Sequence, residues 1–230
     1  MSCALFLRWT RPAAPDHAGS RADGAAVLAL LAPRADCAGA AFYEPVQVAD
    51  PLLRAAAGHD WMLRLDFAHV DALRRAAGPN GWIAALCRAP ALGPLLACEL
   101  SVQAMRRVYL HALPSATPIP PRACAYLAGY EGDPPDPRAW IAEYLDGHVP
   151  LMQELPGQRE TAVYTRFEHN VALPGRPLNW MLRSHALFDT AQALAQALDT
   201  PVRRALREHR ARMPPAGGQD EHLPMLAQRR

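Results

Sequence analysis

One segment, "EYLDGHVPLM" from Glu143 to Met152, places an imidazole and a phenol where they could handle protons together. The pKa of a histidine lies near neutrality, so His148 could act as a general acid or base. Tyr144 comes four residues earlier, about one helical turn away on the same face. Pro150 does not fit the interior of a regular helix, so we expect the helix to end or kink beside His148. The alternatives are a histidine that bonds a backbone carbonyl at a helix end and a tyrosine that belongs to the core.

A second set of polar residues is marked by a repeat, because "WMLR" occurs at Trp61 to Arg64 and again at Trp180 to Arg183. Successive side chains of a strand point to opposite faces. In the first copy, the apolar set that begins with Trp61 should face helices, and Arg64 should face an enclosed interior. The same alternation in the second copy predicts two residues facing outward, Trp180 and Leu182, and three facing inward, Met181, Arg183 and His185.

An enclosed arginine needs a partner, because a buried charge is costly unless it is paired or bound to an anion. Asp66 could pair with Arg64, whereas Arg183 has only His185 beside it. An anionic group of a ligand is therefore one expected partner for Arg183. The alternative is that both arginines lie at the mouth of a barrel and pair with acids such as Glu131 or Glu168.

Neighbouring strands and the C-terminal region supply further candidates, although the face that each strand residue presents stays open. The predicted catalytic set is His148, Tyr144 and Arg183. The predicted substrate-binding set is Tyr126, Tyr164, Arg166, His185, His222 and Arg64.

The composition excludes several classes of chemistry. All 24 basic residues are arginine, so the chain has no lysine for a Schiff base, a pyridoxal phosphate anchor or a P-loop. No cluster of His and Cys has the spacing of a zinc site, and no nucleophile-elbow or dinucleotide-binding pattern occurs. We therefore expect neither a metal nor a cofactor. A net charge of +2 with scattered arginines favours neither a nucleic-acid partner nor a membrane.

Cysteine use and the lack of long apolar runs favour a cytoplasmic protein. The five cysteines are odd in number, lie far apart and form no CxxC pair. The N-terminal residues carry no leader pattern, and no apolar run approaches the ~20 residues needed to span a bilayer. The expected partner is a small-molecule substrate, and the pairing of two such chains into a homodimer stays open.

The elements that must position these residues fall into two similar halves around a Pro-rich linker, residues 113–121. Residues 1–112 have the pattern strand, helix, strand, strand, helix, strand, and the second helix is broken by Gly-Pro-Asn-Gly. Residues 122–230 repeat this order, and Thr200-Pro201 breaks the second helix at the corresponding place. Asp136, followed by Pro137, gives a capping signal for the helix that carries the acid–base candidates.

This order of elements is that of a ferredoxin-like unit, an antiparallel sheet with helices on one face. The bare faces of two such units can meet to form one barrel with the helices outside. We therefore predict an α+β protein in which two ferredoxin-like (βαββαβ) repeats, fused in one chain, form a pseudo-dimeric α/β barrel. The shared order, the shared helix break and the shared WMLR favour an internal duplication.

The C-terminal half resembles the EthD-type proteins of the dimeric α/β-barrel superfamily. The carrying segments are "EYLDGHVPLMQELPG", "FDTAQALAQALDTPVRRALRE" and "MPPAGGQDEHLPM", within residues 122–226. The family signature of a Tyr, then His-x-Pro-Leu, then Leu-Pro-Gly is matched by Tyr144, His148, Pro150, Leu151, Leu155, Pro156 and Gly157, and His222 matches a later element. The N-terminal half lacks His-x-Pro-Leu and looks like a degenerate copy, so we expect one site rather than two.

The resemblance implies a small-molecule-binding barrel. Related proteins include ether-degradation proteins, lactone isomerases and polyketide cyclases or dehydratases, mostly without a cofactor, and fold kinship does not choose among them. The preferred hypothesis is a cofactor-independent isomerase, cyclase or lyase that acts on an aromatic, polyketide-like or lactone substrate, with His148 as general acid or base. The runner-up is a non-catalytic accessory or binding protein of an oxygenase-linked degradation pathway. Haem chemistry, which occurs on related barrels, is a third class.

Overall fold

Antiparallel strands close into one barrel in the computed structural model of the chain, which describes residues 2–11, 22–52, 60–167 and 172–230. A two-residue strand, β7 (Arg176–Pro177), lies outside this ring, and the last strand of the ring pairs with the first to close it. Around the barrel the order is β1 (Cys3–Thr10), β3 (Asp60–Phe67), β2 (Gly39–Pro45), β9 (Gly217–Arg229), β5 (Arg122–Gly132), β8 (Trp180–Phe188), β6 (Gln158–Arg166) and β4 (Glu99–Ala112).

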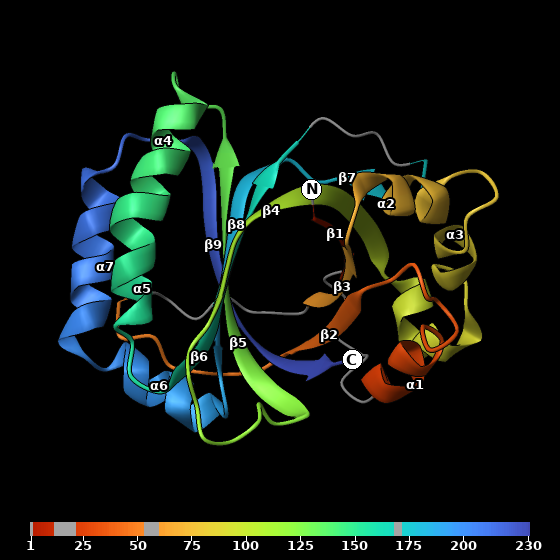
Figure 1. Ribbon diagram of the computed structural model, residues 1–230, viewed down its shortest axis with the longest axis horizontal. Coiled ribbons are helices and arrows are strands. Elements are labelled where there is room, and N and C mark those ends of the chain that lie inside the picture. Colours follow the sequence, from red (N-terminus) through yellow and green to blue (C-terminus); the bar gives the residue numbers. More distant parts are fainter. Residues whose placement is uncertain (1, 12–21, 53–59, 168–171) are drawn as a thin grey trace.

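The helices cover two opposite outer sides of the barrel (Figure 1). One side carries α1 (Gly24–Ala29), α2 (Val70–Ala77), α3 (Ile83–Leu86) and a 3-10 helix at Pro90–Ala97. The other side carries α4 (Pro137–Glu143), a π-helical turn at Tyr144–His148, α5 (Val149–Gln153), α6 (Ala191–Leu198) and α7 (Pro201–Arg212). No helix in the described part of the chain is long and apolar enough to cross a membrane.

Each half of the chain contributes four neighbouring strands to the barrel. The N-terminal half supplies β4, β1, β3 and β2, and the C-terminal half supplies β9, β5, β8 and β6. The two sets meet where β2 pairs with β9 and where β4 pairs with β6. The two copies of WMLR lie in β3 and β8, which hold the same place within their sets. The predicted α+β barrel with helices outside is therefore confirmed.

Local sequence signals set the ends of several helices as predicted. Asp136 caps α4, because its carboxylate accepts a hydrogen bond from the backbone N–H of Ala139 at 3.0 Å. The second helix of the C-terminal half is divided at Thr200-Pro201 into α6 and α7. In the N-terminal half, a Cβ at Gly81 would come within 2.0 Å of the carbonyl oxygen of Ala76, so the break after α2 requires glycine there.

Each strand has one face inside the barrel and one under the helices, and the first copy of WMLR follows the predicted alternation. Trp61 and Leu63 belong to the core between the sheet and the helices of the N-terminal half. Met62 belongs to the core inside the barrel. Arg64 lies on the same inner face, where its guanidinium pairs with Asp66 at 3.0 Å, as predicted.

The second copy departs from the prediction at its first two residues. Leu182 pairs with Tyr130 of β5, and Trp180 pairs with the next residue of β5, so Met181 is an extra residue in β8. This β-bulge turns Trp180 into the barrel and Met181 toward the helices, which reverses both predicted orientations. After the bulge the predicted orientations are right, with Leu182 toward the helices and Arg183 and His185 inside.

The centre of the barrel is filled by side chains. The apolar part of this inner core includes Phe6, Met105, Leu187 and Met225. Toward one end Arg183 pairs with Glu221, which also bonds Arg8 at 2.9 Å. Toward the other end Arg64 bonds His185 at 3.1 Å. The polar inner face predicted from WMLR therefore serves internal hydrogen bonds and ion pairs rather than a central ligand cavity.

Removing the carboxylate of Glu221 tests this description. Arg183 is only 2% exposed, so Glu221→Ala leaves a buried guanidinium without its acid and should lower the free energy of unfolding by about 3 kcal/mol. Arg176→Ala, which breaks an exposed ion pair with Glu99, is the matched control and should cost no more than about 0.5 kcal/mol. Urea denaturation measures both, and equal effects of the two variants would contradict a buried ion pair.

Candidate functional site

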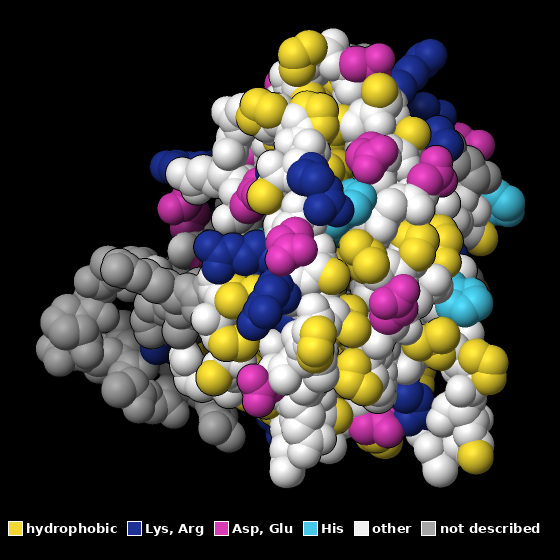
Figure 2. Space-filling view, turned by 90° about the vertical axis from the view of Figure 1, so that its left-hand side faces the viewer, with side chains coloured by type: hydrophobic (Ala, Val, Ile, Leu, Met, Phe, Trp, Pro, Cys, Tyr) yellow, Lys and Arg dark blue, Asp and Glu magenta, His cyan; other side chains and the backbone are white. Residues whose placement is uncertain are grey.

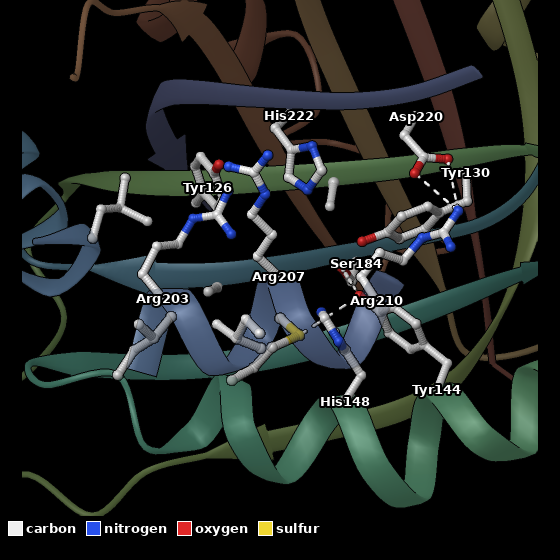
Figure 3. Close-up of a pocket in the computed structure, with 16 residues that line it drawn as sticks. Tyr126, Tyr130, Tyr144, His148, Ser184, Arg203, Arg207, Arg210, Asp220 and His222 are labelled. Carbon is white, nitrogen blue, oxygen red and sulfur yellow. Dashed lines mark hydrogen bonds and ion pairs between the residues drawn. The ribbon is translucent and has the colours of Figure 1, made fainter. Parts of the chain in front are cut away.

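A cavity of about 200 Å³ lies outside the barrel, between the sheet and the helices of the C-terminal half. Its lining comes from β5, β8 and β9 on the sheet side, and from the π-helical turn, α5 and α7 on the helix side (Figure 3). Figure 2 looks onto this helical side of the molecule, where basic side chains and a histidine appear among hydrophobic ones. The cavity therefore lies on the outer face of the sheet and not in the barrel interior.

His148 reaches the cavity from a helix that changes its hydrogen bonding at this point. Residues Tyr144–His148 form a π-helical turn, in which the backbone N–H of Val149 donates to the carbonyl of Tyr144. The helix then continues as α5 through Pro150. Of the two expected outcomes, an end or a kink at His148, the helix shows an irregularity rather than an end, because the π turn accommodates the residue that lacks a backbone N–H. The predicted irregularity is present, and turns of this kind are frequent at functional sites.

Tyr144 stands beside His148, as the four-residue spacing predicts. The centroids of the two rings are 4.7 Å apart, and Tyr144 also stacks on Trp140. The hydroxyl of Tyr144 lies 2.8 Å from Oγ of Ser184 on β8. Burial raises the pKa of Tyr144 to about 12. The phenol is therefore protonated near neutral pH and can donate a hydrogen bond.

The imidazole of His148 is buried and uncharged near neutral pH. Burial lowers its pKa to about 3, and the positive charges of nearby basic groups act in the same direction. Its Nδ1 lies 3.4 Å from Nδ1 of His209 on α7. Its Nε2 has no hydrogen-bond partner among the residues that the structure describes. A neutral ring with a free nitrogen at a cavity offers a lone pair to a ligand.

Three arginines of α7 line the cavity. Two of them, Arg203 and Arg210, each pair with an aspartate at 2.9 Å, respectively Asp50 and Asp220. Arg207 lies between them in the sequence, and within the described ranges its guanidinium bonds only the backbone carbonyl of Leu52, at 3.2 Å. Arg207 is therefore a cation at the cavity with no carboxylate partner in the described part of the chain.

Tyr126 and His222, both predicted as site residues, lie on the sheet side of the cavity (Figure 3). Their ring centroids are 5.6 Å apart, and the hydroxyl of Tyr126 donates to Asp50 at 2.5 Å. Burial lowers the pKa of His222 to about 4, and the charge of Arg203 adds to this. The cavity thus combines two neutral imidazoles with a basic wall, an arrangement that favours a ligand in which negative charge develops.

The predicted site residues divide between the two faces of the sheet. Arg183 is inside the barrel, and Glu221 takes the place of the ligand anion predicted for it. Glu131 is not the partner of this pair, and Glu168, the other acid considered, lies outside the described residues. Arg166 is at the end of β6, where it bonds Asn179 and Asp133. The four predicted residues that do meet at the cavity are Tyr126, Tyr144, His148 and His222.

Arg64 and Tyr164 line a second cavity, of about 290 Å³, at one mouth of the barrel. His185 lies close to both, but its two ring nitrogens are occupied, at 3.1 Å from Arg64 and 2.9 Å from Glu160. Burial lowers the pKa of His185 as well. Because neither nitrogen is free, this ring is less suited to acid–base work than His148. Among the described residues no three His, Cys, Asp or Glu side chains gather as a metal site would require.

Sequence reasoning missed several polar residues at or beside the helix-side cavity, among them Ser184, Arg207 and His209. Ser184 lies between two residues predicted to face inward, so the alternation rule alone places it on the opposite face, toward Tyr144. No comparable signal exists for the other two. Helix α7 carries basic residues all along its length, and its periodicity does not show which of them turn toward the sheet.

Acid should destabilise the protein through its buried histidines. His148 and His222 have folded-state pKa values of about 3 and 4, below the ordinary value of 6.5. The unfolded state therefore binds more protons below pH 6.5, and the free energy of unfolding falls as the pH is lowered from there. Each ring contributes a slope of at most about 1.4 kcal/mol per pH unit.

Urea midpoints between pH 6.5 and 5.5 measure this slope, above the range from 4.5 to about 2 in which Glu160, with its lowered pKa, takes part. His222→Gln should reduce the slope. His111→Gln, at an exposed strand end, is the matched control and should not change it. A slope in His222→Gln equal to that of the unsubstituted protein would contradict the buried neutral state.

Comparison with known proteins finds similarity in structure only. No family model and no curated protein sequence matches the chain. A solved structure of an anthrone oxidase-like protein matches with a TM-score of 0.60 at 12% identity, over 100% of this chain and 92% of that chain. A candidate monooxygenase from Fusobacterium nucleatum matches with a TM-score of 0.58 at 8% identity, over 99% of this chain and 92% of that chain. Identities this low show a shared fold.

An EthD family protein of Bacillus halodurans is also among the similar solved structures. It is 25% identical, it corresponds to 44% of this chain and 95% of its own, and its TM-score is 0.37. On the first two of these structures, the chain is an α+β barrel protein with the dimeric α/β-barrel fold in a single polypeptide.

Proposed function

We propose that the chain is a small-molecule-binding barrel enzyme that moves a proton on a carbon acid without a bound cofactor. The reaction class is that of an isomerase, cyclase or lyase, and the substrate is aromatic, polyketide-like or a lactone. The observation that carries the proposal is His148, a buried neutral imidazole with a free Nε2 beside a protonated tyrosine in a cavity. One similar solved structure is of an anthrone oxidase-like protein, and an anthrone is an aromatic ketone with an acidic C–H bond, which supports this substrate class.

In the proposed reaction, Nε2 of His148 takes a proton from the carbon next to a carbonyl group. The electron pair of the broken C–H bond moves onto the carbonyl oxygen and forms an enolate. Tyr144 and Arg207 are the proposed donors to this oxygen or to another acidic group of the substrate, because a fixed donor is most effective where charge develops. Arg183, which the sequence suggested for this role, lies on the other face of the sheet. Return of the proton to a different atom, or loss of a leaving group, completes the reaction.

The role of His148 can be tested with phenylpyruvate, an aromatic keto acid with an acidic methylene group. Exchange of its methylene protons in D₂O is followed by proton NMR, and the unsubstituted protein should accelerate it above a buffer blank. His148→Ala should slow the exchange by about 100-fold or more, as loss of a general base does. Affinity for phenylpyruvate, measured by calorimetry, should change by less than about threefold.

His111→Ala, an exposed histidine away from the cavity, is the matched control and should behave as the unsubstituted protein. Equal loss of exchange and affinity in His148→Ala would contradict the acid–base role. Binding of phenylpyruvate by the unsubstituted protein without any exchange would favour the runner-up, a non-catalytic binding protein.

The role of Arg207 can be tested by comparing phenylpyruvate with phenylacetone, which lacks the carboxylate. Arg207→Gln should raise KM for phenylpyruvate about tenfold, because it removes one charge-assisted hydrogen bond. KM for phenylacetone should stay within about twofold. Arg204→Gln, an exposed arginine on the same helix, is the matched control. An equal change for both compounds in Arg207→Gln would show that this residue does not read the acidic group.

We also propose that residues 1–112 and 122–230 descend from one duplicated ferredoxin-like unit, joined by residues 113–121. The equal strand order of the two halves and the equal place of WMLR support this. Aligned on WMLR, Ser184 and Ala186 at the cavity correspond to Leu65 and Phe67, which fill the core on the same face of the N-terminal half. Among the described residues, the larger side chains occupy the space in the N-terminal half that is equivalent to the cavity of the C-terminal half, which supports the proposal of one such site.

A further inference from the structure

We propose that His209 and Glu143 are positioning residues that hold His148 in one tautomer, with the proton on Nδ1 and the lone pair of Nε2 directed to the substrate. The inference deepens the proposed function, on which its kinetic part rests. It is carried by a chain of three ionisable side chains that runs from the cavity to the surface.

The contacts form an ordered series. Oε1 of Glu143 lies 3.2 Å from Nε2 of His209, and Nδ1 of His209 lies 3.4 Å from Nδ1 of His148. The side chain of Glu143 is 57% exposed, whereas His209 and His148 are buried. The series therefore leads from a solvated carboxylate through one buried ring to the ring at the cavity.

The carboxylate decides which ring nitrogens carry protons. A carboxylate only accepts hydrogen bonds, so its 3.2 Å contact with Nε2 of His209 favours the tautomer with the proton on that nitrogen. In that tautomer a neutral His209 has its lone pair on Nδ1, and the 3.4 Å contact is then a hydrogen bond donated by Nδ1 of His148. The proton of neutral His148 is thereby fixed on Nδ1, and Nε2 is left as the base.

The backbone beside His148 is shaped to admit His209. A Cβ at Gly147 would lie 2.3 Å from Nε2 of His209 and 3.2 Å from Oε1 of Glu143. Any larger residue at this position would displace the buried ring of α7 from its contact. Gly147 belongs to the π-helical turn that carries His148, so one local irregularity both turns His148 to the cavity and leaves room for His209.

The charges around the pair show why a carboxylate matters. Arg203 and Arg210 of α7 and His222 of β9 face His148 and disfavour its protonation, and each arginine is held by its own aspartate. Glu143 is the carboxylate in contact with the histidine pair. When Nε2 of His148 takes a proton, one C–H bond breaks, one N–H bond forms, and nothing is oxidised or reduced. The Nδ1 proton of His148 is then drawn toward His209, whose Nε2 proton is drawn toward Glu143, so the new charge is shared toward the surface.

The tautomer can be read directly by long-range proton–nitrogen NMR on nitrogen-15-labelled protein at about pH 7, where the ring is neutral. The signals of His148 are assigned by their loss in His148→Gln. We expect Nδ1 protonated and Nε2 unprotonated in the unsubstituted protein. His209→Leu should release the ring to a mixture of tautomers, whereas His209→Gln, whose amide oxygen can accept from Nδ1, should keep it. A protonated Nε2 in the unsubstituted protein, or an unchanged tautomer in His209→Leu, would overturn the proposal.

Kinetics supply a second readout, with phenylpyruvate exchange as the assay. His209→Leu should lower kcat about 10- to 100-fold with little change in KM, and His209→Gln should recover most of it. Glu143→Ala removes an exposed side chain and keeps the test usable if His209→Leu fails to fold; it too should lower kcat and release the tautomer. Glu208→Ala is the matched control, because Glu208 is exposed and lies next to His209 on α7.

The two proposals fail in different ways. If the tautomer responds to His209→Leu but the unsubstituted protein does not exchange phenylpyruvate, the proposed function fails and the positioning role stands. If exchange depends on His148 but the tautomer and kcat ignore His209 and Glu143, the positioning role fails alone.

Discussion

Closure of the antiparallel sheet is the constraint on which the rest of the structure depends. In a closed sheet every strand has both neighbours, so the phase of each strand fixes which side chains enter the barrel and which lie under the helices. The inner face is occupied by apolar residues and by ion pairs such as Arg183–Glu221. The outer face of the C-terminal half keeps small side chains at Ser184 and Ala186, and the cavity forms above them. The cavity that contains His148 is thereby on the outer side of the sheet.

Much of this arrangement was accessible from the sequence, and the failures have identifiable physical causes. The order of strands and helices, the cap at Asp136 and the pairing of Arg64 with Asp66 follow from local patterns. The orientation of Trp180 does not follow from such patterns, because a β-bulge inserts one residue and no residue type in WMLR predicts the bulge. The prediction that Arg183 and His148 share one site was made because alternation separates the two faces of a strand but does not say on which face a cavity forms. The structure places Arg183 inside the barrel and His148 at the outer cavity. Contacts between distant elements, such as that of His209 with His148, depend on how α7 packs against the π-helical turn, which local sequence patterns do not specify.

The arginines have different roles inside the barrel and at the cavity. Inside the barrel, Arg64 and Arg183 each pair with a carboxylate, so each buried charge is balanced by its partner. On α7 the basic groups face a cavity instead and act at short range on two imidazoles, which burial has already made hard to protonate. A site built this way holds its base in the unprotonated form and offers positive potential where an anion would appear. The neutral state of the two imidazoles therefore comes from their environment.

The bulge at Met181 changes which side chains close one end of the barrel. In a regular strand, residues three apart point to opposite faces, but the extra residue brings Trp180 and Arg183 onto the same inner face, with the guanidinium 5.2 Å from the indole ring. Trp180 and Arg183, together with Glu221 and Arg8, fill that end of the barrel. The barrel interior is thus closed by side chains at that end, and the cavity at His148 lies on the opposite face of the sheet, under the helices.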